Sequence, residues 1–238
     1  RWVVGRRTED FTIDVTHALE QVASHAPAVV LLASPNNPTG TALALYLVEA
    51  ICEAATGVVV VDEAYAEFRR AGVPSALTLL ARNPRLAVTR TMSKAFALAG
   101  GRVGYLAASR ELVDVLRVVR LPYHLSAVTQ AVARAALAHT DELLGQVDAL
   151  RAERDRTVAW LRERGLRAAE SDANFVLFGT FADRRAVWQG LLDSGVLIRE
   201  TGPDGWLRVS IGTGAEMARF RACLTDVLAQ TQQEVLVP

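Results

Sequence analysis

Four polar side chains of different chemistry follow apolar segments of this sequence, in the order Asp62, Tyr65, Lys94 and Arg102. A lysine amine can hold an aldehyde covalently, and a carboxylate can hold a proton on a pyridine nitrogen. A phenol can donate a hydrogen bond to a ring oxygen, and a guanidinium can bind a phosphate. Each residue type is common by itself. Together, and in this order, they supply the contacts that a pyridoxal phosphate cofactor needs.

Lys94 ends the segment Thr91-Met92-Ser93-Lys94, and small apolar residues and glycines follow it as far as Gly101. A lysine beside the end of a strand is most often a solvated surface charge. Here we expect the apolar neighbours to remove water from the amine, which favours its neutral and nucleophilic form. The segment therefore indicates a lysine that forms a Schiff base.

Asp62 follows four consecutive valines, at the predicted end of a buried strand. The carboxylate can cap a helix or form a turn, but a protonated pyridine nitrogen would give it the cationic partner that burial requires. Tyr65 lies three residues further on, and Asn37 lies in a turn rich in proline. Both can donate a hydrogen bond to a ring oxygen; the alternatives are core packing for Tyr65 and turn formation for Asn37.

Arg102 can form a phosphate site with Thr91 and Ser93, because hydroxyl groups and one guanidinium near a strand-to-loop turn suit an anion. The alternative is a surface arginine beside two turn-forming residues.

Short apolar runs alternate with helical patterns, which predicts an α/β protein. In the first half we expect strands at 28–33, 58–61, 86–90 and 104–108 and helices at 41–56 and after Ser109. The second half begins with a helical pattern over 126–164, with a break near 139–145. Strands are then predicted at 174–178, 196–199 and 206–211, and helices at 182–194 and 215–230. Ligands of open α/β sheets bind beyond the carboxyl ends of strands, which is where Asn37, Asp62 and Lys94 lie.

The composition argues against several classes of protein. The 238 residues carry 26 basic and 26 acidic side chains, a balance that argues against a nucleic-acid partner. Charged residues interrupt every apolar stretch before it could span a bilayer. Two scattered cysteines, Cys52 and Cys223, suit neither a disulfide framework nor a metal site, and we expect a cytoplasmic protein.

Five motifs resemble those of the fold-type-I pyridoxal phosphate aminotransferases and, more narrowly, of the histidinol-phosphate aminotransferases. They are Ser34-Pro35-Asn36-Asn37-Pro38-Thr39-Gly40, Asp62-Glu63-Ala64-Tyr65, Thr91-Met92-Ser93-Lys94-Ala95-Phe96, Ala99-Gly100-Gly101-Arg102-Val103-Gly104-Tyr105 and Ala173-Asn174-Phe175. The resemblance implies a large cofactor domain with a mixed or parallel sheet, incomplete at its N-terminus, over 1–125. A linking helix and a small α/β domain would occupy 126–238.

The resemblance also implies residue roles. Lys94 would be the Schiff-base lysine, Asp62 would bind the pyridine nitrogen, and Tyr65 and Asn37 would bind the ring oxygen. Ser93, Arg102 and Thr91 would hold the cofactor phosphate.

Substrate binding would fall to Arg208, Arg199 and Asn174. An arginine between a leucine and a valine on a buried strand is costly unless it is paired, and its planar fork suits a carboxylate or a phosphate. The alternative for Arg208 is an internal salt bridge to Glu200 or Asp204.

The implied reaction is reversible amino transfer between L-histidinol phosphate and 2-oxoglutarate, which gives imidazole-acetol phosphate and L-glutamate. The implied assembly is a homodimer. Three alternatives remain: an aromatic amino-acid aminotransferase, a phospho-amino-acid decarboxylase of the same fold, and an effector-binding domain of a regulator.

Members of the family carry roughly a hundred residues before the position that matches Arg1. Those residues include a phosphate-binding turn and an aromatic side chain that stacks on the cofactor ring. We therefore expect that a segment precedes Arg1, and that residues 1–238 alone bind pyridoxal phosphate weakly or not at all.

Overall fold

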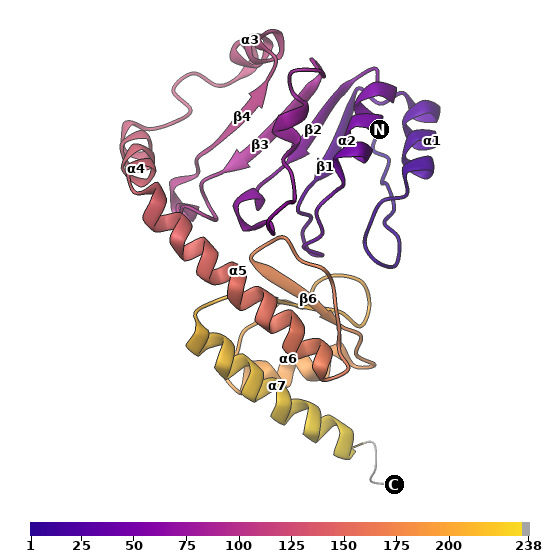
Figure 1. Ribbon diagram of the computed structural model, residues 1–238, viewed down its shortest axis with the longest axis vertical. Helices are drawn as coiled ribbons and strands as arrows, with labels where there is room; N and C mark the ends of the chain where they lie inside the picture. The colour runs from indigo at the N-terminus through magenta and orange to yellow at the C-terminus, as the bar shows by residue number, and fades with distance from the viewer. Residues whose placement is uncertain (235–238) are drawn as a thin grey trace.

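The computed structural model describes residues 1–234, with side chains described through residue 230. It contains two sheets joined by a long helix (Figure 1). The last four residues of the second predicted domain, 235–238, lie outside the described residues.

The first sheet has four strands in the order β1 (Val29–Ala33), β2 (Val58–Asp62), β3 (Leu86–Thr91) and β4 (Gly104–Ala108). β1, β2 and β3 are parallel, and β4 is antiparallel to β3. Each strand lies within one residue of the predicted range at either end. The mixed α/β class is thereby confirmed.

One face of this sheet forms a core because its valines and leucines pack under α1 (Val15–His25) and α2 (Leu45–Ala54). β-branched side chains on adjacent strands fit such a half-buried pleated surface. Val29 and Leu31 of β1 point to the other face and are exposed.

The prediction that α2 begins at residue 41 is wrong. The Thr41 hydroxyl lies 2.7 Å from Thr39 Oγ1, and the Leu43 N–H donates to Ser34 Oγ at 2.9 Å. These bonds hold residues 41–44 against the preceding turn, so the first helical residue is Leu45. Side chains with hydroxyl groups compete with helical hydrogen bonding in this way.

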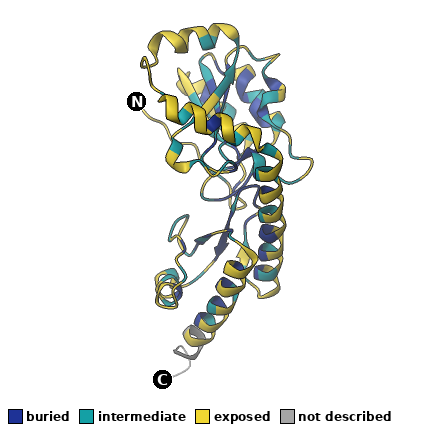
Figure 2. Cartoon of the chain, turned by 90° about the vertical axis from the view of Figure 1, so that its left-hand side faces the viewer, coloured by how far each residue is buried: buried dark blue, intermediate teal, exposed yellow. Residues whose placement is uncertain are grey.

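Three helices follow the first sheet: α3 (Arg110–Val119), α4 (Ala127–Ala138) and α5 (Thr140–Glu163). Ser109 and Ser126 cap α3 and α4 through hydrogen bonds from Leu112 N and Thr129 N, as expected for serine at this position. The predicted break falls at His139. α5 runs from the first sheet to the second (Figure 1). Figure 2 shows buried positions in the sheets and along α5, whereas α3 is largely exposed.

The second sheet is antiparallel, with β5 (Arg167–Ala168), β6 (Phe175–Gly179) and β7 (Leu207–Ser210) in that order. α6 (Arg184–Asp193) and α7 (Gly214–Glu234) complete this half and share a core with β6, β7 and α5. The strand predicted at 196–199 is wrong, because one isolated bridge between Arg199 and Arg208 is all that pairs there.

A separate apolar cluster joins the two halves. It contains Tyr65 and Phe68 from the first half, Val147 from α5, and Ala173 and Phe175 from the second half. No helix in the described part of the chain is both long enough and apolar enough to cross a membrane.

Candidate active site

Three of the predicted site residues lie at or just beyond the carboxyl ends of adjacent parallel strands. Asn37 follows β1, Asp62 ends β2, and Lys94 follows β3. Parallel strands direct their carboxyl ends to the same edge of a sheet, which explains why residues distant in sequence gather there.

The Lys94 amine lies over the Tyr65 ring, 5.6 Å from the ring centre. The expectation that apolar neighbours bury Lys94 is wrong. Ala95 and Phe96 pack in the cluster around Tyr65, whereas the Lys94 side chain is exposed. Among the described residues, nothing hydrogen-bonds or ion-pairs with the amine.

Tyr65 is buried, and desolvation raises the pKa of its phenol. The nearby Arg208 guanidinium acts in the opposite direction, and Asp62 adds to the rise. The phenol therefore stays protonated at neutral pH and can donate a hydrogen bond. No described residue accepts one from it.

Asp62 is only partly engaged by the protein. Its Oδ1 atom accepts from Ala64 N at 3.0 Å and from the Thr89 hydroxyl at 3.4 Å, and no described residue contacts Oδ2. The exposed carboxylate can therefore accept a further donor, such as a protonated ring nitrogen.

Glu63 is a residue that the sequence reasoning missed. Its carboxylate is buried and accepts from Arg90 Nη2 at 2.7 Å, Ser75 Oγ at 2.7 Å and Ala76 N at 2.7 Å. Side chains alternate between the faces of a strand, so the Asp62-Glu63 pair at a strand end predicts one carboxylate on each side. That signal was present in the sequence.

Thr91, Ser93 and Arg102 form one cluster. The Thr91 hydroxyl donates to Ser93 Oγ at 2.9 Å, and Arg102 Nη1 lies 3.5 Å from the same oxygen. Arg102 also donates to Ala99 O at 2.9 Å from a left-handed backbone conformation. Two hydroxyl groups and an exposed guanidinium converge here, which is a donor set suited to a phosphate.

Arg208 of β7 reaches into the first half, where its Nη1 atom donates to Asn37 Oδ1 at 2.5 Å. The guanidinium carbon lies 4.7 Å above the centre of the Phe175 ring. Because Asn37 Oδ1 accepts this hydrogen bond, the side-chain nitrogen of Asn37 is the group that can still donate to a ligand. Burial lowers the pKa of Arg208, and its Nε atom is buried without a hydrogen-bond partner.

The alternative of a salt bridge from Arg208 is wrong. Glu200 pairs with Arg185 at 2.7 Å, and both Glu200 and Asp204 lie near Arg184. Arg208 is a half-buried cation with no carboxylate partner among the described residues.

Arg199 and Asn174 are less engaged. Arg199 is exposed and exchanges backbone hydrogen bonds with Arg208 at 2.9 Å, without a described side-chain partner. Asn174 is half-buried, and its backbone oxygen accepts from Ile211 N at 2.9 Å while its amide group has no described bond. The structure places Arg199 opposite Arg208 and Asn174 just before β6, and no described hydrogen bond joins either side chain to the other site residues.

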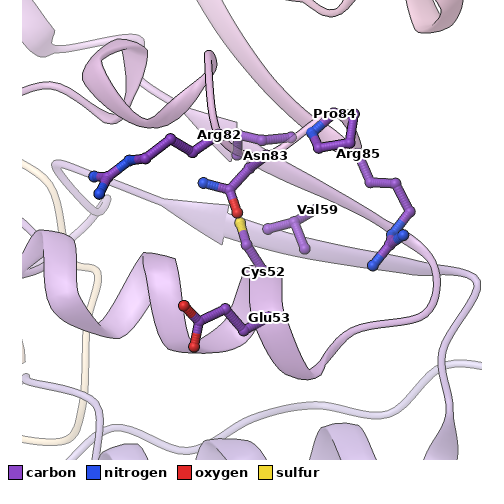
Figure 3. A pocket seen from close by; sticks show the side chains of 8 residues that line it. Cys52, Glu53, Val59, Arg82, Asn83, Pro84 and Arg85 are labelled. Carbon is purple, nitrogen blue, oxygen red and sulfur yellow. The ribbon is translucent and has the colours of Figure 1, made fainter.

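A cavity of about 210 Å³ lies at the opposite edge of the sheet, near the beginnings of β2 and β3. Figure 3 shows Arg82 and Arg85 on its two sides, with side chains that extend away from each other. Arg82 pairs with Glu49, Arg85 donates to Ala55 O, and burial raises the pKa of the Cys52 thiol to about 11. The two arginines of this cavity are therefore already engaged by the protein, and its thiol is protonated at neutral pH.

The unpaired groups of the active-site edge fit pyridoxal phosphate. An amine, a carboxylate oxygen, a phenol and an amide nitrogen there have no hydrogen-bond partner among the described residues, and a donor cluster suited to phosphate lies beside them. The buried, unpartnered Nε atom of Arg208 adds a position for an anionic group of a substrate.

The chain is similar to known aminotransferases, which agrees with a site that fits pyridoxal phosphate. The chain is 66% identical over 223 residues to histidinol-phosphate aminotransferase 3 of Burkholderia lata, which covers 94% of the chain and 60% of that protein. It is 65% identical to the histidinol-phosphate aminotransferase of Thermobifida fusca, with 94% and 61% covered. The chain thus spans about 60% of the length of these relatives.

Among solved structures, histidinol-phosphate aminotransferase from Sinorhizobium meliloti in complex with pyridoxal-5'-phosphate matches with a TM-score of 0.86 and 30% identity, over 97% of the chain and 65% of that structure. The sequence profile of aminotransferase class I and II matches residues 2–224. The chain therefore belongs to the class I and II aminotransferases.

Proposed function

We propose that this chain carries the catalytic lysine and most of the cofactor contacts of a histidinol-phosphate aminotransferase. The observation that carries the proposal is the unpaired Lys94 amine beside Tyr65, at the edge where Asp62 and Asn37 also lie. The substrate assignment, L-histidinol phosphate with 2-oxoglutarate, rests on the identity of 65% and 66% to the two relatives described above.

The residues would divide the work as follows. Pyridoxal phosphate, when bound, supplies a ring that withdraws electrons from the substrate. Lys94 would hold the cofactor and, once free, move a proton to and from the substrate Cα as general base and acid. Asp62 would keep the pyridine nitrogen protonated. Tyr65 and Asn37 would donate to the ring oxygen.

The remaining contacts concern anions. Thr91, Ser93 and Arg102 would hold the cofactor phosphate, and Arg208 would bind the phosphate of one substrate and a carboxylate of the other. Arg199 and Asn174 would complete that site. We also propose a cofactor domain over 1–125, a smaller domain after it, a homodimeric assembly and a cytoplasmic location.

An amino-transfer assay tests the proposal. The chain is mixed with L-histidinol phosphate, 2-oxoglutarate and a large excess of pyridoxal phosphate, which offsets the weak cofactor binding expected of residues 1–238, and L-glutamate is measured. We expect glutamate to form at a rate that Lys94→Arg abolishes. Glutamate formation that is much faster with aromatic amino acids than with L-histidinol phosphate would contradict the substrate assignment, and equal rates with and without Lys94 would contradict the mechanism.

Arg208→Lys refines the test. A lysine keeps the charge but replaces a two-pronged fork with a single point of contact. We expect the KM for both L-histidinol phosphate and 2-oxoglutarate to rise at least tenfold, by about the energy of one charge-assisted hydrogen bond. Unchanged KM values for both substrates would remove Arg208 from the substrate site.

A further inference from the structure

Arg154 of α5 is a fully buried arginine without a buried carboxylate partner. Its Nε atom donates to Asp155 Oδ1 at 2.9 Å, but the Asp155 side chain is 57% exposed. A buried cation is costly unless polar groups surround it. Something other than a buried ion pair must therefore retain this guanidinium inside the protein.

Two backbone oxygens from different halves of the chain accept from the same nitrogen. Arg154 Nη1 donates to Phe68 O at 2.5 Å and to Ala173 O at 3.3 Å. Nη2 is also buried and has no hydrogen-bond partner among the described residues. The guanidinium is thus a link between the segment after β2 and the segment before β6.

The two linked segments carry site residues. Tyr65 precedes Phe68 by three residues, and Ala173 is followed directly by Asn174 and Phe175. The Tyr65 and Phe175 rings meet edge to face, with centres 5.1 Å apart. Lys94 lies over the first ring and Arg208 over the second. A shift between the segments would therefore change the relation of the cofactor residues to the substrate arginine.

A second pair lies at the same junction. Asp172 is 2% exposed and accepts from Arg70 N at 2.9 Å, from Arg70 Nε at 3.0 Å and from Arg70 Nη2 at 3.1 Å. The Asp172 N–H donates to Gly40 O at 2.7 Å, in the turn that carries Asn37. The junction between 66–70 and 170–174 is therefore closed by Arg70 on its outer side and by Arg154 on its inner side.

We propose that Arg154 is a positioning residue of the active site, whose guanidinium fixes the segment of Tyr65 against the segment of Asn174 and Phe175. The functional meaning of this role rests on the function proposed above. The structural link itself does not, and it can be tested without cofactor or substrate.

Hydrogen exchange of the cofactor-free chain tests the link. In Arg154→Met the aliphatic stem remains and the donors are lost. We expect the amide exchange rates of 66–70 and 170–174 to rise together by about tenfold or more, because both segments open locally when the link is lost. The control is Arg151→Met, on the same helix, which removes a pair with the exposed Asp148 and should leave both segments unchanged.

Exchange that rises equally over the whole chain would show that Arg154 only contributes to global stability, and no rise in either segment would show that the link is absent; both results overturn the proposal. If Arg154→Met does not fold, Arg154→Gln is measured instead, because its amide nitrogen ends two atoms short of Nη1, and unchanged exchange in both segments would overturn the proposal.

Arg154→Ala allows a rescue experiment, whose result would not depend on guanidinium if Arg154 only contributed to packing. Millimolar guanidinium should restore slow exchange in the two segments, whereas sodium chloride at the same ionic strength should not. Equal recovery with both salts would contradict the proposal. If the amino-transfer assay fails while these exchange results hold, the proposed function is wrong and the structural link stands.

Discussion

At the scale of single residues, neighbouring side chains have different roles. One faces the active site, and the next stabilises the structure around it. Asp62 faces the open site, whereas the next residue, Glu63, is buried between Arg69, Arg90 and Ser75. Lys94 is the only lysine in the sequence. Apart from the histidines, all the other basic side chains are arginines. Guanidinium groups remain charged and form the structural pairs, which leaves the one amine for covalent chemistry.

The Asp62-Glu63 pair gives the first prediction. Asp62→Asn should leave stability nearly unchanged but reduce turnover by two orders of magnitude or more, because an amide cannot keep the pyridine nitrogen protonated. Glu63→Gln should lower the free energy of unfolding by about 3 kcal/mol, since it removes the buried carboxylate that the half-buried Arg69 and Arg90 share. Denaturant unfolding and steady-state turnover of both variants measure this. The assignment fails if Asp62→Asn turns over normally or Glu63→Gln is as stable as the parent.

At the scale of elements, the strands of the first sheet were predictable because short runs of valine and leucine favour a buried strand. The start of α2 was not, because Thr41 and Leu43 bond to the turn before it. Neither was the bridge at Arg199, whose segment alternates like a strand but pairs at one position. Short-range patterns indicate strand and helix preference, whereas pairing depends on partners far away in the sequence.

Gly104 gives a prediction about the β3–β4 pair. A Cβ atom at this position would lie 2.4 Å from Arg90 O, a backbone atom that cannot move without disturbing the pair. Gly104→Ala should therefore cost about 1–3 kcal/mol of unfolding free energy and weaken cofactor binding, since β4 begins beside Arg102. Gly100→Ala is the matched control, because a Cβ there meets nothing within 4 Å. Similar stability of the two variants, measured by thermal unfolding, would contradict the expected clash.

Glu153 gives a prediction about how α5 is held to α7. Burial alone acts to raise the pKa of Glu153, but hydrogen bonds from Arg221 and Arg156 outweigh it and hold the pKa below its usual value. A lowered pKa in the folded state means that the stabilisation is complete above the ordinary glutamate pKa of about 4.5 and is lost as the pH falls through the folded value.

Glu153→Gln should accordingly be less stable than the parent at neutral pH, and the difference should shrink as the pH falls below 4.5. Thermal unfolding between neutral and acid pH measures it, with Asp148→Asn, an exposed pair on the same helix, as the control. A stability difference that stays constant down to the most acid pH would contradict the pairing.

At the scale of the whole molecule, the site is built from both halves. Asn37 and Arg208 are joined by a hydrogen bond across the two sheets, and Arg70 and Arg154 close the junction beneath them. The sequence motifs predicted which residues gather at the sheet edge. They could not predict the Arg208–Asn37 contact or the acceptors of Arg154, because such contacts depend on how the two halves pack. The domain division at residue 125 stays a prediction.

The central claim, that Lys94 is the residue that binds the cofactor, can be tested most directly by reductive trapping. The chain is incubated with a large excess of pyridoxal phosphate, reduced with borohydride and examined by mass spectrometry of the intact chain and its peptides. Because Lys94 is the only lysine of the sequence, it is the one side-chain amine that borohydride could trap as an adduct. We predict one cofactor per chain, on the peptide that contains Lys94, and its loss in Lys94→Arg. Label only on peptides that lack Lys94, or equal label in Lys94→Arg, would contradict the account.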